Sequence, residues 1–156
     1  MVKLEKQRIV DNSIGRGLCF FTSVFNKNKK LNKPTGNKEI NKIIVYRLSA
    51  IGDSVLLLPM LKKLKQETNA EIIVICSKEN KSIFENQGFI DKTILFQNNT
   101  LNPFKILKTV KEIKKEKADI AIDTTQTLNF SAFLSKITSK TNMGFENKKT
   151  KLRNKS

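Results

Sequence analysis

Residues 42–59 read KIIVYRLSAIGDSVLLLP, and this segment decides the fold. Its apolar, β-branched run at 43–46 predicts a strand that is buried on both faces. A tight loop containing Gly52 follows, and we expect Asp53 or Ser54 to cap a helix that starts just after them. A strand, a short loop and a helix N-terminus form the first half of a βαβ unit. In open α/β sheets, ligands bind at the carboxyl ends of such strands.

Strand and helix patterns continue to alternate along the chain. Strands are predicted at residues 71–76, 92–96, 118–123 and 141–145, and helices up to residue 68 and at residues 79–86, 102–117 and 129–137. Helical crossovers between strands require parallel pairing with right-handed connections. The predicted fold class is therefore α/β: a single Rossmann-like open parallel sheet in the order 3-2-1-4-5, with helices on both faces.

One predicted helix contains a proline, and another contains a pair of opposite charges. Pro59 lacks a backbone N–H and crowds the preceding turn, so we expect it to kink or restart the helix that follows the first strand. In the helix predicted at 102–117, Lys108 and Glu112 have the spacing of a surface ion pair of little energetic weight.

The chain of 156 residues is long enough for one domain with a core, and its charge is unevenly spread. We divide it into a basic, partly amphipathic extension and linker at 1–42, a Rossmann-like domain at 43–145 and a basic tail at 146–156. The net charge of +16 is concentrated in the two ends. A nucleic-acid-binding domain builds its basic face into the fold, so we expect no nucleic acid partner. Peripheral contact of the ends with anionic membrane and simple solvation of lysine-rich tails both stay open.

Apolar residues at helical intervals within 8–25 allow two interpretations of the extension. The segment either lies on the inner surface of the cytoplasmic membrane or docks on the domain itself. No stretch reaches the roughly 20 apolar residues that span a bilayer.

The composition excludes several kinds of chemistry. The chain has no histidine, which rules out histidine-based acid–base catalysis and histidine-containing zinc sites. Cys19 and Cys76 lie far apart with no metal-binding or disulfide spacing, which fits a reducing cytoplasm. The loop after the first strand has one glycine rather than the G-x-G-x-x-G fingerprint of dinucleotide-binding proteins. We therefore expect neither a bound cofactor nor a metal site.

An ordered series of motifs resembles glycosyltransferase family 9, the heptosyltransferases of lipopolysaccharide synthesis. It covers roughly residues 42–145 and comprises RLSAIGD at 47–53 with LP at 58–59, AEI at 70–72, GFIDK at 88–92, ADIAID at 118–123 and NMGF at 142–145. The resemblance implies the N-terminal, acceptor-binding half of a GT-B enzyme, whose second domain binds the nucleotide-sugar through a motif with glycine and histidine. Because this chain has no histidine and no second domain, we expect it to be truncated or split and inactive alone.

The function that this resemblance implies is inverting, metal-independent transfer of a sugar from a nucleotide-sugar to a lipopolysaccharide core acceptor. The expected partners are a sugar or lipid-linked oligosaccharide acceptor and, through the missing domain, the nucleotide-sugar. The expected location is the cytoplasm, with peripheral contact at the inner membrane face as an option. A non-enzymatic Rossmann-like module that binds an anionic glycolipid or membrane surface is the alternative.

The loop after the first strand, which we call the first loop, holds the main candidate for catalysis. Asp53 follows the first strand at a helix start, where the helix dipole favours a carboxylate, and it could accept a proton from a sugar hydroxyl. The family resemblance implies the same general-base role, while the plain alternative is an N-cap. Gly52 would allow close approach of a ligand or a positive φ, or would serve the turn alone. Ser49 and the N–H groups of this loop could hold an acceptor hydroxyl or phosphate.

The loop after the fourth strand, which we call the second loop, should lie beside the first loop. The reason is that the switch point of the sheet falls between the first and fourth strands. Asp123 ends the fourth strand, and the neutral hydrogen-bonding side chains that follow suit a sugar acceptor: Thr124, Thr125, Gln126 and Asn129. Alternatively, Asp123 and the two threonines only cap the next helix. Arg47 leaves the first strand toward the same edge, where it could meet an acceptor phosphate or pair with Asp123.

Overall fold

A computed structural model of the protein describes residues 39–96, 103–125 and 129–144, and for residues 103, 129 and 130 it describes the backbone alone. Strands and helices alternate through these residues in the order β1 (Lys42–Arg47), α3 (Ile51–Thr68), β2 (Glu71–Cys76), α4 (Lys81–Phe84), β3 (Lys92–Leu95), α5 (Pro103–Lys115), β4 (Ala118–Asp123), α6 (Asn129–Thr138) and β5 (Ser139–Gly144). Most of the predicted extension and the predicted basic tail lie outside the described residues.

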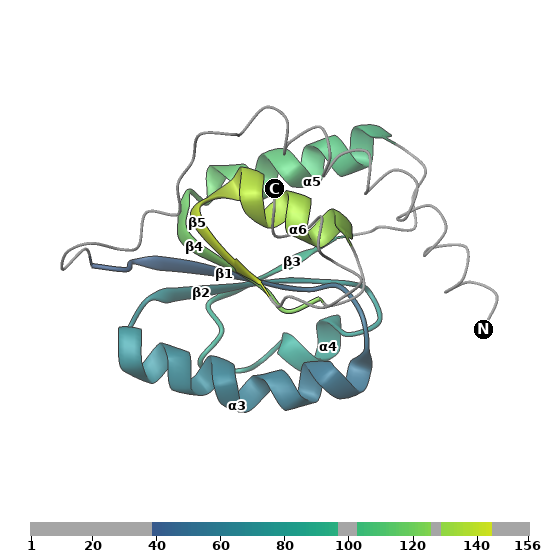
Figure 1. Cartoon of the computed structure of the whole chain (residues 1–156). Coiled ribbons are helices and arrows are strands. Elements are labelled where there is room, and N and C mark those ends of the chain that lie inside the picture. Colours follow the sequence, from purple (N-terminus) through teal and green to yellow (C-terminus); the bar gives the residue numbers. More distant parts are fainter. Residues whose placement is uncertain (1–38, 97–102, 126–128, 145–156) are drawn as a thin grey trace.

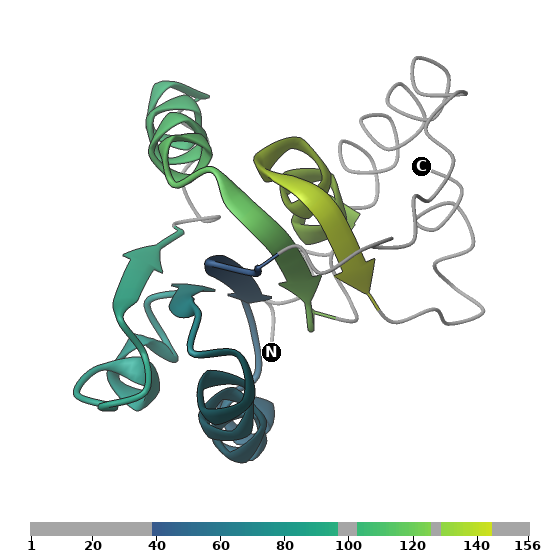
Figure 2. The same cartoon turned by 90° about the vertical axis from the view of Figure 1, so that its left-hand side faces the viewer.

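The strands form one sheet in the order β3-β2-β1-β4-β5, and each neighbouring pair is parallel. This confirms the predicted fold class and strand order. The central strand β1 places Ile44 opposite Ile73 of β2 and Ala121 of β4. Helices α3 and α4 cover one face of the sheet, and α5 and α6 cover the other (Figures 1 and 2).

The core divides into two layers because successive side chains of a strand point to opposite faces. Ile43 and Val45 of β1 pack in the layer that contains Leu57 and Leu61 of α3. The alternate residues of β1 pack in the layer beneath α5 and α6, which contains Ile44, Tyr46, Ile113 and Leu134. Burial of both faces explains why β1 and β2 read as continuous apolar runs.

Helix α3 begins earlier than the sequence predicts. Its N-cap is Ala50, with φ of 63°, and no side chain caps it. The expected capping by Asp53 or Ser54 is therefore wrong: Asp53 lies in the first turn, and the buried Ser54 hydroxyl donates to the Ala50 carbonyl at 2.8 Å. The expected restart at Pro59 is also not seen, since α3 continues through it as one helix.

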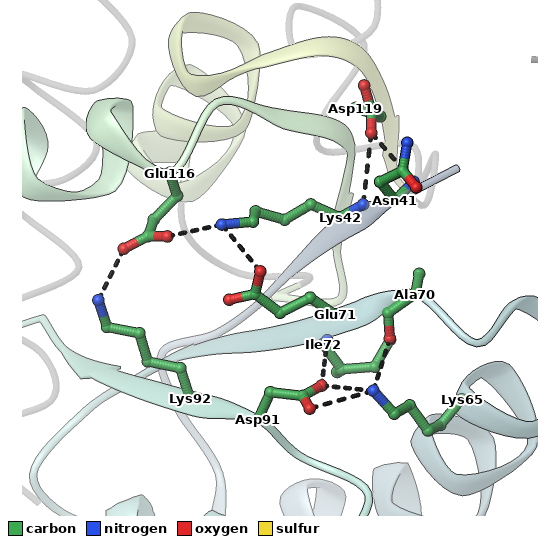
Figure 3. Close-up of polar contacts among 10 residues, drawn as sticks. All are labelled: Asn41, Lys42, Lys65, Ala70, Glu71, Ile72, Asp91, Lys92, Glu116 and Asp119. Atoms are coloured by element: carbon green, nitrogen blue, oxygen red, sulfur yellow. Dashed lines mark hydrogen bonds and ion pairs between the residues drawn. The ribbon is translucent and has the colours of Figure 1, made fainter. Parts of the chain in front are cut away.

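The amino-terminal edge of the sheet is held by a network of ion pairs (Figure 3). Lys42, at the start of β1, contacts Glu71 at 2.9 Å and Glu116 at 3.0 Å. Glu116 also accepts from Lys92 at 2.7 Å, while Asp119 accepts the backbone N–H of Lys42 at 3.3 Å. These contacts connect β1, β2, β3 and β4 at the edge opposite the candidate site.

Candidate active site

The loops at the carboxyl edge of the sheet are joined by hydrogen bonds. The buried Asn80, in the loop before α4, donates to the Arg47 carbonyl at 3.0 Å and to the Ser54 hydroxyl at 2.8 Å. Its side-chain Oδ1 accepts the Ser77 backbone N–H at 2.9 Å. Asn80 thus ties the end of β1 and the first turn of α3 to the loop that follows β2.

The loop after β4 is fixed to the end of β1 in the same way. The Thr124 hydroxyl and backbone N–H both donate to the Tyr46 carbonyl, at 2.8 and 3.1 Å. The Leu48 backbone N–H donates to the Thr125 hydroxyl at 3.1 Å. The predicted proximity of the first and second loops is therefore confirmed at the switch point between β1 and β4.

Arg47 connects the two loops to helix α3. One guanidinium nitrogen donates to the Thr124 carbonyl at 2.5 Å, and the other forms an ion pair with the Asp53 carboxylate. The Nε atom is buried and has no hydrogen-bond partner within the described residues. Of the two expected roles for Arg47, pairing with a nearby aspartate is observed, but the partner is Asp53 rather than Asp123.

The two members of this ion pair have very different exposure. The Arg47 side chain is 7% exposed, whereas the Asp53 side chain is 61% exposed. Arg47 contacts only Oδ2 of Asp53, and no other described residue hydrogen-bonds the remaining oxygen. A carboxylate that is anchored on one side and open to solvent on the other can accept a proton from a bound hydroxyl.

The backbone before Asp53 is unusual at Ala50 rather than at Gly52. Ala50 has φ of 63° and ψ of 105°, a conformation that L-residues with a Cβ rarely adopt. Gly52 lies in the first turn of α3, and a Cβ there would meet no atom within 4 Å. The positive φ that we considered for Gly52 therefore occurs two residues earlier, while the space around Gly52 is open. Ser49 is half-buried between Leu48 and Ala50.

Asp123 is 1% exposed and organises the second loop. Its Oδ1 accepts the Thr125 backbone N–H at 2.8 Å, and its Oδ2 accepts the Ser131 hydroxyl at 2.9 Å. These contacts tie the loop after β4 to the first turn of α6. Gln126 lies outside the described residues, and so does the side chain of Asn129.

Sequence reasoning missed Asn80 and the pairing of Arg47 with Asp53. Asn80 had no motif to mark it, and only the neighbouring position of β1 and β2 brings it to this edge. A signal for the ion pair did exist: an arginine at the end of a strand and an aspartate in the first turn of the following helix are both directed to the carboxyl edge of a parallel sheet.

Further features of the described residues concern metal-ligand clusters, membrane-spanning helices and the cysteine Cys76. Among these residues, no group of three or more histidine, cysteine, aspartate or glutamate side chains is placed to hold a metal ion. None of the helices in the described part of the chain is long and apolar enough to cross a membrane. Burial raises the pKa of the Cys76 thiol to about 11, as expected of a structural cysteine.

Fold and site together define a Rossmann-like open α/β domain with an exposed carboxylate at its switch point. No family model matches the sequence, and no curated protein does. Among solved structures, the chain is similar to the glycosyl transferase family 9 structure from Veillonella parvula DSM 2008, with a TM-score of 0.58 and 21% sequence identity. The likeness covers 70% of this chain and 33% of that one, so this chain spans about one third of its length. The resemblance read from the sequence motifs is thereby matched by a likeness in fold.

Proposed function

We propose that residues 43–145 form the acceptor-side domain of an inverting, metal-independent glycosyltransferase that resembles the heptosyltransferases. The reaction would transfer a sugar from a nucleotide diphosphate to a lipid-linked lipopolysaccharide core acceptor at the cytoplasmic face of the membrane. The observation that carries this proposal is the exposed Asp53 carboxylate, which the buried Arg47 holds at the carboxyl edge of the sheet. The fold likeness and the ordered motifs of the sequence support the same class of enzyme.

Asp53 acts as the general base in this proposal. Its free carboxylate oxygen takes the proton from an acceptor hydroxyl while that oxygen attacks the anomeric carbon of the donor. The bond from the anomeric carbon to the nucleotide diphosphate breaks, and the diphosphate leaves with the electron pair. Arg47 fixes the orientation of the carboxylate through Oδ2 and stays bound to the Thr124 carbonyl.

The acceptor would lie along the two loops. Ser49 follows β1, Gly52 lies in the first turn of α3, and Thr124 follows β4 and accepts a hydrogen bond from Arg47. We extend the acceptor site to Gln126 and Asn129 as the sequence suggests. Asp123 contributes by ordering the second loop, because both of its carboxylate oxygens already accept hydrogen bonds. The described domain is expected to bind acceptor by itself and to transfer sugar only together with a nucleotide-sugar-binding domain.

The proposal is tested by replacing the base. The full chain is combined with a family 9 donor-side domain and assayed with nucleotide-diphosphate heptose, nucleotide-diphosphate hexose and a lipopolysaccharide core acceptor. Asp53→Asn should lower turnover roughly 100-fold or more while acceptor binding changes little, because a general base contributes to the transition state. Glu79→Gln is the matched control, since Glu79 is an exposed carboxylate in the neighbouring loop, and it should keep the parent rate.

Two results would contradict the proposal. Turnover that is equal in Asp53→Asn and Glu79→Gln would remove Asp53 from the chemistry. Glycolipid binding that is unchanged in both variants, with no transfer from any donor, would favour the non-enzymatic glycolipid-binding module. Urea unfolding of Asp53→Asn shows whether a lost rate reflects chemistry, because the amide oxygen can still accept from Arg47 and should preserve the fold.

A further inference from the structure

Helix α5 lies over the same face of the sheet as α6 (Figure 1). Ile106, Val110 and Ile113 pack against the core beneath it. At about 100° per residue, Glu112 lies among the lysines on the outer side of the helix, and this outer side also carries five further residues: Phe104, Leu107, Lys108, Lys111 and Lys115. All five are exposed. We call these five residues the α5 stripe.

The stripe combines large apolar groups with positive charge. Phe104 is 79% exposed and Leu107 is 67% exposed, at the end of α5 that follows β3. The three lysines of the stripe continue toward the other end of the helix. The whole of α5 contains five lysines against the single acidic residue Glu112.

Within α5, Glu112 offsets one of the five positive charges. Elsewhere in the described residues many lysines pair with carboxylates, among them Lys42, Lys63, Lys65, Lys81, Lys92 and Lys140. None of the five α5 lysines forms an ion pair with a described residue, and the pair expected between Lys108 and Glu112 is not made. The nearby Glu116 is directed instead to Lys42 and Lys92. The stripe is therefore left with a net positive charge that can meet an external anion.

We propose that the α5 stripe docks the protein on the surface of an anionic lipid bilayer. An amphipathic helix binds such a surface when apolar side chains enter the boundary below the headgroups and lysines meet the anionic lipids. Phe104 and Leu107 supply the first contact, and the lysines supply the second. A nucleic acid would use the lysines, but it offers no partner for the aliphatic Leu107. The proposal rests on α5 alone and not on the chemistry assigned to Asp53.

Phe104 is a convenient reporter position because the chain contains no tryptophan. In the full chain, the fluorescence of a Phe104→Trp variant should shift to shorter wavelength with phosphatidylglycerol vesicles and not with phosphatidylcholine vesicles. Leu56→Trp, at an exposed position on α3, is the control and should not shift. The basic ends of the chain could also bind vesicles. Vesicle binding of the Phe104→Trp variant without any fluorescence shift would therefore show that the ends are responsible, and it would overturn the proposal.

Charge removal provides an independent measurement. Lys108→Gln, Lys111→Gln and Lys115→Gln combined should weaken co-sedimentation with phosphatidylglycerol vesicles roughly tenfold or more. The matched control combines Lys62→Gln, Lys63→Gln and Lys78→Gln, which removes the same charge from exposed positions outside α5, and it should bind within about twofold of the parent protein. Equal loss in the two triple variants would contradict docking through α5. So would a fluorescence shift of the Phe104→Trp variant that is as large with poly(U) as with vesicles, because that would identify a polyanion site.

Discussion

Arg47 and Asp53 form an ion pair that has a structural role and, under the proposal above, a chemical one. Arg47 is buried and connects β1 to the loop after β4, so its charge requires a partner. Asp53 supplies that partner from the solvent side and keeps most of its surface accessible. The RLSAIGD motif made Asp53 a candidate from the sequence alone. The identity of its anchor was not predictable, because Arg47 could equally have turned toward Asp123 at the same edge.

Ala50 is the residue at which the backbone before Asp53 is strained. A Cβ at φ of 63° and ψ of 105° is unfavourable, and glycine has no such penalty. Ala50→Gly should therefore raise the free energy of unfolding by about 1 kcal/mol, as measured by urea denaturation. Asn69→Gly is the control. Asn69 caps the other end of α3 with φ of 51° and ψ of 14°, which asparagine tolerates, so it should change stability by less than about 0.5 kcal/mol. A destabilised Ala50→Gly would show that this backbone is not strained.

At the scale of elements, the buried strands were predicted more accurately than the start of α3. The bounds of β2 and β4 match the prediction, because runs buried on both faces leave a clear apolar signal. Helix α3 begins at Ile51, ahead of both expected capping residues, because the positive φ at Ala50 starts it without any side-chain cap. Local propensity contains no sign of such a start. Local propensity also disfavours proline inside a helix, so the continuation of α3 through Pro59 could not be predicted from the sequence.

Pro59 interrupts the hydrogen bonding of α3 without ending the helix. It lies within an 18-residue helix, has no N–H to donate to the Val55 carbonyl, and is exposed. Pro59→Ala should restore that hydrogen bond and improve helix propensity. The alanine also gives the unfolded chain more freedom, which offsets part of this gain. The free energy of unfolding should therefore rise by about 1 kcal/mol. Urea unfolding with far-UV circular dichroism measures both stability and helix content. Lower stability in Pro59→Ala would mean that the surrounding structure depends on the proline geometry.

At the scale of the whole molecule, the two edges of the sheet differ in the residues that they carry. The amino edge is closed by the ion-pair network of Figure 3. The carboxyl edge carries the Asp53 site, and α5 begins there because it follows the end of β3. Under the two proposals made above, a bilayer on the α5 stripe and an acceptor beside Asp53 would both lie toward this edge. A lipid-linked acceptor would then reach the base without leaving the membrane surface.

The amino edge should make stability depend on pH in the acidic range. Hydrogen bonds from Lys92 lower the pKa of Glu116, and those from Lys140 lower the pKa of Asp119. Burial opposes ionisation of Asp91, but hydrogen bonds from Lys65 and the Ile72 N–H outweigh it and lower this pKa as well. A carboxyl with a lower pKa in the folded state contributes stability above its unfolded pKa of about 4 and loses it as the pH falls through the folded value.

The free energy of unfolding should therefore fall between about pH 5 and pH 2, as measured by urea denaturation across that range. Glu116→Gln should lower stability at neutral pH and flatten this dependence, because Glu116 contacts both Lys42 and Lys92. Glu67→Gln is the control, since Glu67 is 62% exposed in an i,i+4 pair with Lys63, and it should keep the parent pH dependence. If Glu116→Gln retained the full acid dependence, the network would not be its source. The carboxylates that hold the strands together would then contribute to geometry without contributing measurably to stability.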